Sequence, residues 1–161
     1  MTVDTEKSTI LLRTFKPGDE QPFKELNEIW ISTDFALEAA DHEVLDNPRR
    51  EILDKGGEIC VAEIDGKVMG CCALLFIGEN EYELAKMTVA SEARGLGIGR
   101  KLLQFAIEHA RKIGVRRLYL ESNTKASDAV HLYEALGFRH LAGPEHASKY
   151  ARANVFMEMF L

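Results

Sequence analysis

The sequence has no apolar run near the ~20 residues that cross a bilayer, and its first residues, MTVDTEKST, lack the apolar core of a signal peptide. It also has no basic run longer than Arg116-Arg117, and its net charge is −6. Because a phosphate backbone requires a clustered basic face, these features exclude nucleic acid as the main partner. We expect a cytoplasmic protein that binds neither membrane nor nucleic acid.

Cysteine is scarce, with only Cys60, Cys71 and Cys72, all within apolar runs. Adjacent residues of a strand point to opposite faces, so Cys71 and Cys72 cannot grip one metal ion together. The sequence has no CxxC or HxxxH spacing, and its five histidines are dispersed. We therefore predict no metal site.

The chain has an ordinary globular composition, with 46% apolar and 29% charged residues among 161. That length buries roughly two-thirds of the unfolded surface, and no linker, repeat or low-complexity tract divides it. We predict one α/β domain over residues 1–161.

The N-terminal half alternates strand and helix patterns. A strand at 9–15 ends at Pro17-Gly18, and Asp19 is expected to cap a helix whose apolar stripe is Phe23, Leu26, Ile29 and Trp30. One or two short helices follow, ended by Gly56-Gly57. Two strand patterns joined at Asp65-Gly66 predict a hairpin, and 81–89 is a third strand of this sheet.

The C-terminal half begins with a long amphipathic helix that Gly114 terminates. Its predicted buried stripe is Ile98, Leu102, Ala106, Ala110 and Ile113. A strand at 115–122, a helix at 127–136 ended by Gly137, a strand from Phe138 and a last strand at 151–161 complete the chain.

The segment SEARGLGIGRKLL places Gly95, Gly97 and Gly99 where a helix should begin. Glycine in a helical turn costs roughly 0.5–1 kcal/mol relative to alanine, so three glycines here need a reason. Either they form a plain loop, or they expose backbone N–H groups that bind an anion such as phosphate. The sequence lacks the GxxxxGK[ST], GxGxxG, HRD and DFG strings, which excludes the P-loop, dinucleotide and kinase versions of such a site.

The remaining pattern, RxxGxG at residues 94–99, resembles the signature of the GNAT superfamily of N-acetyltransferases. It follows the strand YELAKMTV, opens the helix GRKLLQFAIEHARKIG and precedes HLYEALGF, which is similar to the LYxxxGF block of that superfamily. The resemblance implies a mixed, mostly antiparallel central sheet with a splayed strand pair, flanked by helices. It also implies acetyl-CoA (coenzyme A) as co-substrate.

Backbone amides at the start of the long helix lack intrahelical partners and carry the positive end of the helix dipole, so they suit the diphosphate of coenzyme A. A Cβ at Gly97 or Gly99 is expected to crowd that approach. The resemblance adds a bulged strand whose backbone pairs with the pantetheine, and a polar residue at the cleft edge. The predicted cofactor-binding residues are Met87, Thr88, Val89, Arg94, Gly95, Leu96, Gly97, Ile98, Gly99, Arg100 and Asn123.

Two residues are candidates for catalysis. Glu83 matches the catalytic glutamate of one branch of the superfamily, and the alternative is a structural or substrate-binding carboxylate. Alternation along the strand predicts that Glu83, Ala85, Met87 and Val89 share one face. Tyr133 is the candidate acid for the departing thiolate, and the alternative is a core tyrosine with an incidental partner.

The acceptor is left open by two conflicting cues. Acidic residues in 34–47 suit a cationic amine or form a solvated helix face, whereas Arg152, near His146 and Tyr150, suits a carboxylate. The predicted function is transfer of an acetyl group from acetyl-CoA to a primary amine of a small molecule, peptide or protein within a ternary complex. The alternative is a non-catalytic acyl-CoA-binding module. A homodimer is compatible with the sequence.

Overall fold

A single seven-stranded sheet organises the chain in the computed structural model, which describes residues 8–161. The strand order is β1-β2-β3-β4-β5-β7-β6, and every neighbouring pair is antiparallel except β4 and β5. The strands are β1 (Ile10–Thr14), β2 (Glu58–Ile64), β3 (Lys67–Gly78), β4 (Glu81–Val89), β5 (Arg117–Ser122), β6 (Arg139–His140) and β7 (Val155–Phe160).

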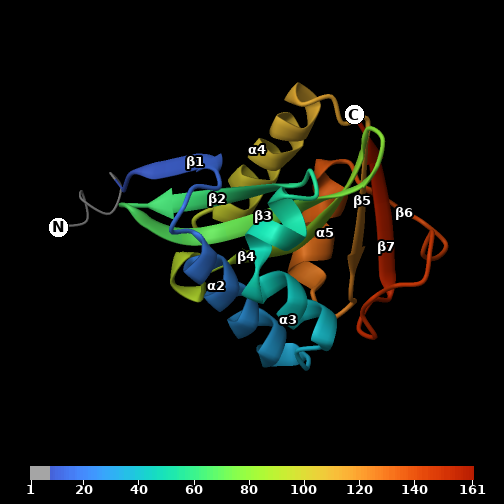
Figure 1. Cartoon of the computed structure of the whole chain (residues 1–161), viewed down its shortest axis with the longest axis horizontal. Helices are drawn as coiled ribbons and strands as arrows, with labels where there is room; N and C mark the ends of the chain where they lie inside the picture. Colours follow the sequence, from blue (N-terminus) through green and yellow to red (C-terminus); the bar gives the residue numbers. More distant parts are fainter. Residues whose placement is uncertain (1–7) are drawn as a thin grey trace.

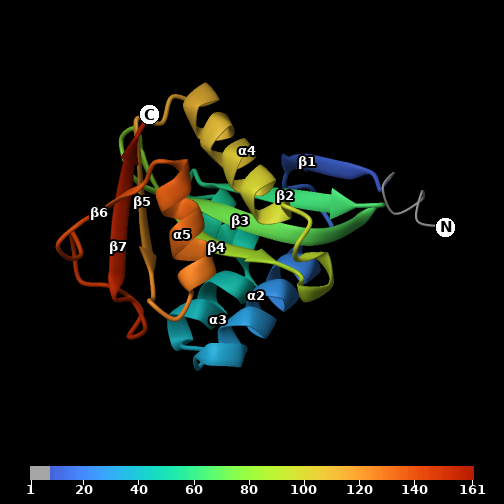
Figure 2. The same ribbon diagram turned by 180° about the vertical axis from the view of Figure 1, so that it is seen from behind.

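Helices cover both faces of the sheet, as Figures 1 and 2 show from opposite sides. One apolar core lies under α4 and α5, and a second lies under α2 and α3. This arrangement confirms the predicted α/β class with a mostly antiparallel sheet flanked by helices. The helices are α2 (Glu20–Asp34), α3 (Ala39–Asp46), the short η1 (Arg49–Leu53) and η2 (Ser91–Ala93), α4 (Ile98–Lys112) and α5 (Ser127–Leu136).

Local turn chemistry agrees with the sequence at three places. Asp65 and Gly66 have φ values of 50° and 86°, which is the geometry of a tight turn between antiparallel strands. Gly114 and Gly137 follow α4 and α5 with φ values of 91° and 110°, so each lies in the left-handed region that ends helices.

Three details of the predicted helices are wrong. Asp19 does not cap α2 with its side chain, because its carboxylate accepts hydrogen bonds from Arg13 and from the Lys16 amide instead. Ile29 is 65% exposed, and the buried face of α2 consists of Phe23, Asn27 and Ile31. Ile113 is also exposed, since α4 ends one residue before it.

The parallel pair β4 and β5 separates part-way along its length. Pairing runs from Glu81 opposite Arg117 to Leu84 opposite Leu120 and does not continue beyond that point. The resemblance implied this splayed pair, and the strand pairing confirms it. The separation opens the sheet at its centre.

A β-bulge lies in β4 just past the point of separation. The three-residue step from Ala85 to Thr88 in β4 lies opposite the two-residue step from Ala73 to Cys71 in β3, and Lys86 has a φ of 54°. The extra residue reverses the alternation of side chains.

Consequently the predicted common face of residues 83, 85, 87 and 89 is wrong. Glu83 lies opposite Leu75, which packs with the core under α2 and α3. Met87 and Val89, beyond the bulge, pack with the core under α4 and α5.

Candidate active site

A cleft of about 540 Å³ opens where β4 and β5 part. Its walls come from α2, β4, the start of α4, the end of β5, α5 and the loop before β7. The predicted site residues that line it are Glu83, Met87, Thr88, Val89, Arg94, Gly95, Gly97, Ile98, Gly99, Asn123 and Tyr133. Leu96 and Arg100 are predicted site residues that do not line the cleft, and Leu96 is 53% exposed.

The glycine loop owes its shape to two left-handed residues. Gly95 and Gly97 have φ values of 84° and 74°, which side chains rarely adopt, and Gly97 directly precedes α4. A Cβ on Gly97 would meet no protein atom within 4 Å, so backbone conformation, and not crowding by the protein, requires glycine there. The first amides of α4 have no intrahelical acceptor, so the loop fits the diphosphate of coenzyme A.

Gly99 has a different role, because it lies inside the first turn of α4 with an ordinary helical φ. A Cβ on it would point among Val89, Leu132 and Met87 at 3.6–3.7 Å, which is normal van der Waals contact. The protein therefore tolerates a side chain at this position, while the cleft loses space beside the helix amides.

The backbone of β4 beyond Leu84 has a sheet partner on one side only. Thr88 and Val89 pair with β3, and pairing with β5 has already ended. An exposed strand edge of this kind can pair with an extended ligand through main-chain hydrogen bonds. The edge from Met87 to Val89 thus fits the amide-bearing pantetheine arm that the resemblance placed there.

Glu83 has an environment suited to a base that works near neutral pH. Burial raises the pKa of its carboxyl group to about 7, and the nearby Glu121 charge adds to the rise. His146, Lys149 and Lys86 oppose the shift. A carboxyl group with this pKa exchanges its proton readily at neutral pH.

Tyr133 lies on the α5 wall and is 7% exposed. Its ring packs edge-to-face on Phe138 with 5.8 Å between centroids. Burial, together with the Cys72 thiol, raises the pKa of Tyr133, so the hydroxyl keeps its proton. Among residues 8–161 no protein group accepts that proton in a hydrogen bond.

Glu121 is a carboxylate of the site that sequence reasoning missed. It lines the cleft at the end of β5 and accepts hydrogen bonds from the Tyr119 hydroxyl at 2.8 Å and the Ser148 hydroxyl at 2.6 Å. Strand alternation puts Glu121 on the face of Tyr119, but only the separation of the strands exposes it. The acidic character of this part of the cleft therefore comes from Glu83 and Glu121.

A buried ion network forms the wall nearest α3. Asp41 is fully buried and accepts hydrogen bonds from Lys86 Nζ at 2.7 Å and from both terminal nitrogens of Arg152 at 2.7 and 2.8 Å. Burial alone would raise the pKa of Asp41, but the hydrogen bonds from Arg152 and Lys86 lower it. Burial also lowers the pKa of Lys86, while the hydrogen bond and the charge of Asp41 raise it. Because the two groups are in contact, each stabilises the ionised form of the other.

This network corrects the expectation for Arg152. Its guanidinium is occupied by Asp41 and, at 3.3 Å, by Glu38, so it does not offer a free fork to a substrate carboxylate. Asn123 is also partly occupied, because its amide donates to the Arg152 carbonyl and accepts from the Lys125 amide. It remains on the cleft wall.

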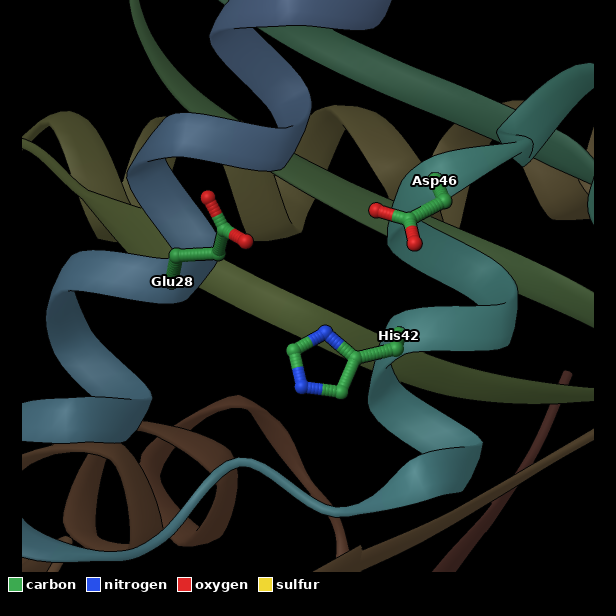
Figure 3. A group of neighbouring side chains, drawn as sticks. All are labelled: Glu28, His42 and Asp46. Atoms are coloured by element: carbon green, nitrogen blue, oxygen red, sulfur yellow. The ribbon is translucent and has the colours of Figure 1, made fainter.

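Three side chains between α2 and α3 point toward one another, as Figure 3 shows: Glu28, His42 and Asp46. Their ligand atoms all lie within 4.8 Å of one another, but Glu28 is only partly buried and His42 and Asp46 are exposed. Asp46 already pairs with Lys24 at 3.0 Å. Within residues 8–161 this group gives no independent indication of a metal ion.

Comparison with known proteins identifies the family. The model of the acetyltransferase (GNAT) family matches residues 21–138, so the chain belongs to that family. Over 119 residues it is 32% identical to the uncharacterized N-acetyltransferase YjgM of Escherichia coli, covering 69% of this chain and 71% of that protein. Further relatives from rat, mouse and human are longer, and the aligned part spans 37% to 56% of their length.

Solved structures agree on the fold. A GNAT acetyltransferase from Staphylococcus aureus superposes with a TM-score of 0.84 at 23% identity, covering 94% of this chain and 99% of that one. The structure of yncA from Salmonella typhimurium with its cofactor acetyl-CoA superposes with a TM-score of 0.71 at 23% identity, covering 95% and 94%.

Family membership sets the class of activity. The chain is an N-acetyltransferase, and acetyl-CoA is its co-substrate. No helix within the described residues is long and apolar enough to span a membrane.

Proposed function

We propose that the protein transfers an acetyl group directly to a primary amine of a small molecule or peptide, with Glu83 as general base and Tyr133 as general acid. One observation carries the proposal. The cleft where β4 and β5 part is lined by the glycine loop, by a carboxyl group with a pKa raised to about 7 and by a protonated tyrosine. Bound acetyl-CoA supplies a thioester, whose carbonyl carbon accepts the amine and whose sulfur leaves as a thiolate.

Glu83 supplies the first proton transfer. An alkylamine has a pKa near 10.4, so at neutral pH almost all of it is the unreactive ammonium. Glu83 accepts the ammonium proton directly or through one water, and Glu121 keeps the surrounding potential negative, which favours a cationic acceptor.

Tyr133 supplies the second proton transfer, from its hydroxyl to the leaving sulfur. It approaches from the α5 side of the cleft, whereas Glu83 belongs to the α2 and α3 side. A backbone N–H near Val89 is the proposed donor to the carbonyl oxygen as negative charge develops on it.

The position of the cysteines supports direct transfer without an acetylated enzyme. Cys60, Cys71 and Cys72 are fully buried, and none of the three lines the cleft. In two-substrate kinetics a ternary complex gives intersecting double-reciprocal lines, whereas a covalent intermediate gives parallel lines.

The test is thiol release from acetyl-CoA with a panel of primary amines, with the acetylated product identified by mass spectrometry. The proposal predicts amine-dependent thiol release in the wild type and its loss in the double variant Glu83→Gln/Tyr133→Phe. A non-catalytic acyl-CoA-binding module would instead bind acetyl-CoA and release no thiol with any amine.

A further inference from the structure

Two cationic side chains hold Tyr150, which lines the cleft. Lys86 Nζ and Arg152 Cζ each lie 4.4 Å from its ring centroid, and Lys86 Nζ also donates to its hydroxyl at 3.2 Å. Both cations are held in turn by the buried carboxylate of Asp41. These contacts fix the position of the Tyr150 ring in the cleft wall.

The Tyr150 hydroxyl is a hydrogen-bond donor available to a ligand. Its oxygen already accepts from Lys86, and among residues 8–161 no group accepts its hydrogen. Burial and the Asp41 charge raise the pKa of Tyr150, so the hydroxyl stays protonated at neutral pH.

The charges behind Tyr150 balance, which restricts the ligand group. The cations Lys86 and Arg152 are matched by Asp41 and Glu38, and the neighbouring Glu83 and Glu121 add negative potential. A carboxylate at Tyr150 would find both of these cations already matched and would meet the charges of Glu83 and Glu121, which Lys149 partly offsets. A neutral carbonyl oxygen accepts the same hydrogen bond without that penalty.

We propose that Tyr150 donates a hydrogen bond to a neutral carbonyl oxygen next to the acceptor amine, and thus selects amino amides and peptide α-amines over simple alkylamines and free amino acids. This inference rests on the proposed acetyl transfer and names its substrate class. Tyr150 acts here on specificity, since it touches the acceptor and takes no part in moving protons.

The experiment compares three acceptors of similar size at saturating acetyl-CoA: alaninamide, alanine and sec-butylamine. Each is assayed with the wild type and with Tyr150→Phe, which keeps the ring and its cation contacts. Loss of one neutral hydrogen bond should lower the preference of kcat/KM for alaninamide over sec-butylamine about fivefold, through KM. Because the same two amines are compared in both proteins, their different pKa values cancel in the change of this preference between wild type and variant. Tyr82→Phe is the matched control, because its hydroxyl bonds the Gly56 carbonyl away from the cleft.

Each result has one meaning. A preference that falls in Tyr150→Phe but not in Tyr82→Phe supports the inference. An unchanged preference, or alanine accepted as well as alaninamide, overturns it. If no acceptor in this or the wider amine panel gives thiol release, the proposed acetyl transfer itself has failed.

Discussion

Replacing Glu83 with glutamine separates its contribution to catalysis from its cost to stability. Glutamine keeps the shape of the side chain and removes both the base and the buried charge. Because burial raises the pKa of Glu83 to about 7, ionisation in the folded protein is unfavourable around neutral pH, where catalysis requires it. The substitution should therefore move activity and stability in opposite directions.

The catalytic effect follows from the titration. With a pKa of about 7, the ionised fraction of Glu83 rises about tenfold between pH 6 and pH 8, and the wild-type rate should rise with it. At pH 7 the glutamine variant should be roughly 10²–10⁴-fold slower, which is the usual contribution of a positioned base. The deficit should shrink toward pH 9–10, because the amine then loses its proton in bulk solvent.

The effect on stability has the opposite sign. An unfolded glutamate titrates near 4.5, so from there to pH 7 unfolding releases a proton, and the free energy of unfolding falls as pH rises. A pKa of about 7 in the folded protein against 4.5 in the unfolded chain lowers the free energy of unfolding by about 3 kcal/mol at most. This loss of stability is complete above pH 7. Glu83→Gln should thus unfold at higher denaturant than the wild type at pH 8, and that gain should vanish near pH 4.

The assays are a pH–rate profile with one accepted amine and urea unfolding at pH 4 and pH 8. Glu79→Gln, at an exposed position, is the control and should change neither. An activity deficit of equal size at every pH would show that Glu83 binds substrate and is not the base. A variant less stable than the wild type at pH 8 would refute the buried-charge argument.

Three other substitutions test the site. Tyr133→Phe should lower kcat about 10²–10⁴-fold with little change in acetyl-CoA affinity, measured by calorimetry. A variant with wild-type turnover would show that Tyr133 only packs in the core. In the wild type, acetyl-CoA at 100 times Kd should raise Tm by about 5–10 °C, and Gly99→Val should abolish most of that rise. The control Gly78→Val, whose added side chain points into open space, should keep it. Asp41→Asn should cost roughly 3–5 kcal/mol in urea unfolding, because it leaves Lys86 facing a neutral amide. A cost under about 1 kcal/mol would mean that solvent reaches the network.

Patterns between close neighbours in sequence predicted most of the fold. The turn at Asp65-Gly66, the helix stop at Gly114 and the buried stripe of α4 all depend on residues within a few positions of each other. The glycine loop was predictable for the same reason, since glycine adopts the left-handed backbone found at Gly95 and Gly97 without the steric cost that other residues have. What these patterns could not give is the exposure of Ile29, which depends on how α2 lies on the sheet.

The ion network of Asp41, Lys86 and Arg152 could not be predicted from the sequence, because its contacts are long-range. Asp41 lies 45 residues from Lys86 and 111 from Arg152, and each is an unremarkable charge in its local sequence. The sequence suggested that Arg152 could bind a substrate carboxylate, because it does not show that Asp41 already pairs with it. The one local signal is Lys86 itself, which lies between Ala85 and Met87 in a strand of the sheet, since a buried lysine requires a partner.

The bulge at Lys86 explains both the failed prediction and the chemistry proposed for the site. A non-glycine residue at a φ of 54° costs of order 1–3 kcal/mol, and here the buried contact with Asp41 holds it. The reversed alternation leaves Glu83 on the α2 and α3 side and turns Met87 toward α4 and α5, where Tyr133 lies. An uninterrupted sheet would separate these two sides. Because β4 and β5 part at the bulge, base and acid line one cleft from opposite faces, as attack by an amine on one side and departure of a thiolate on the other require.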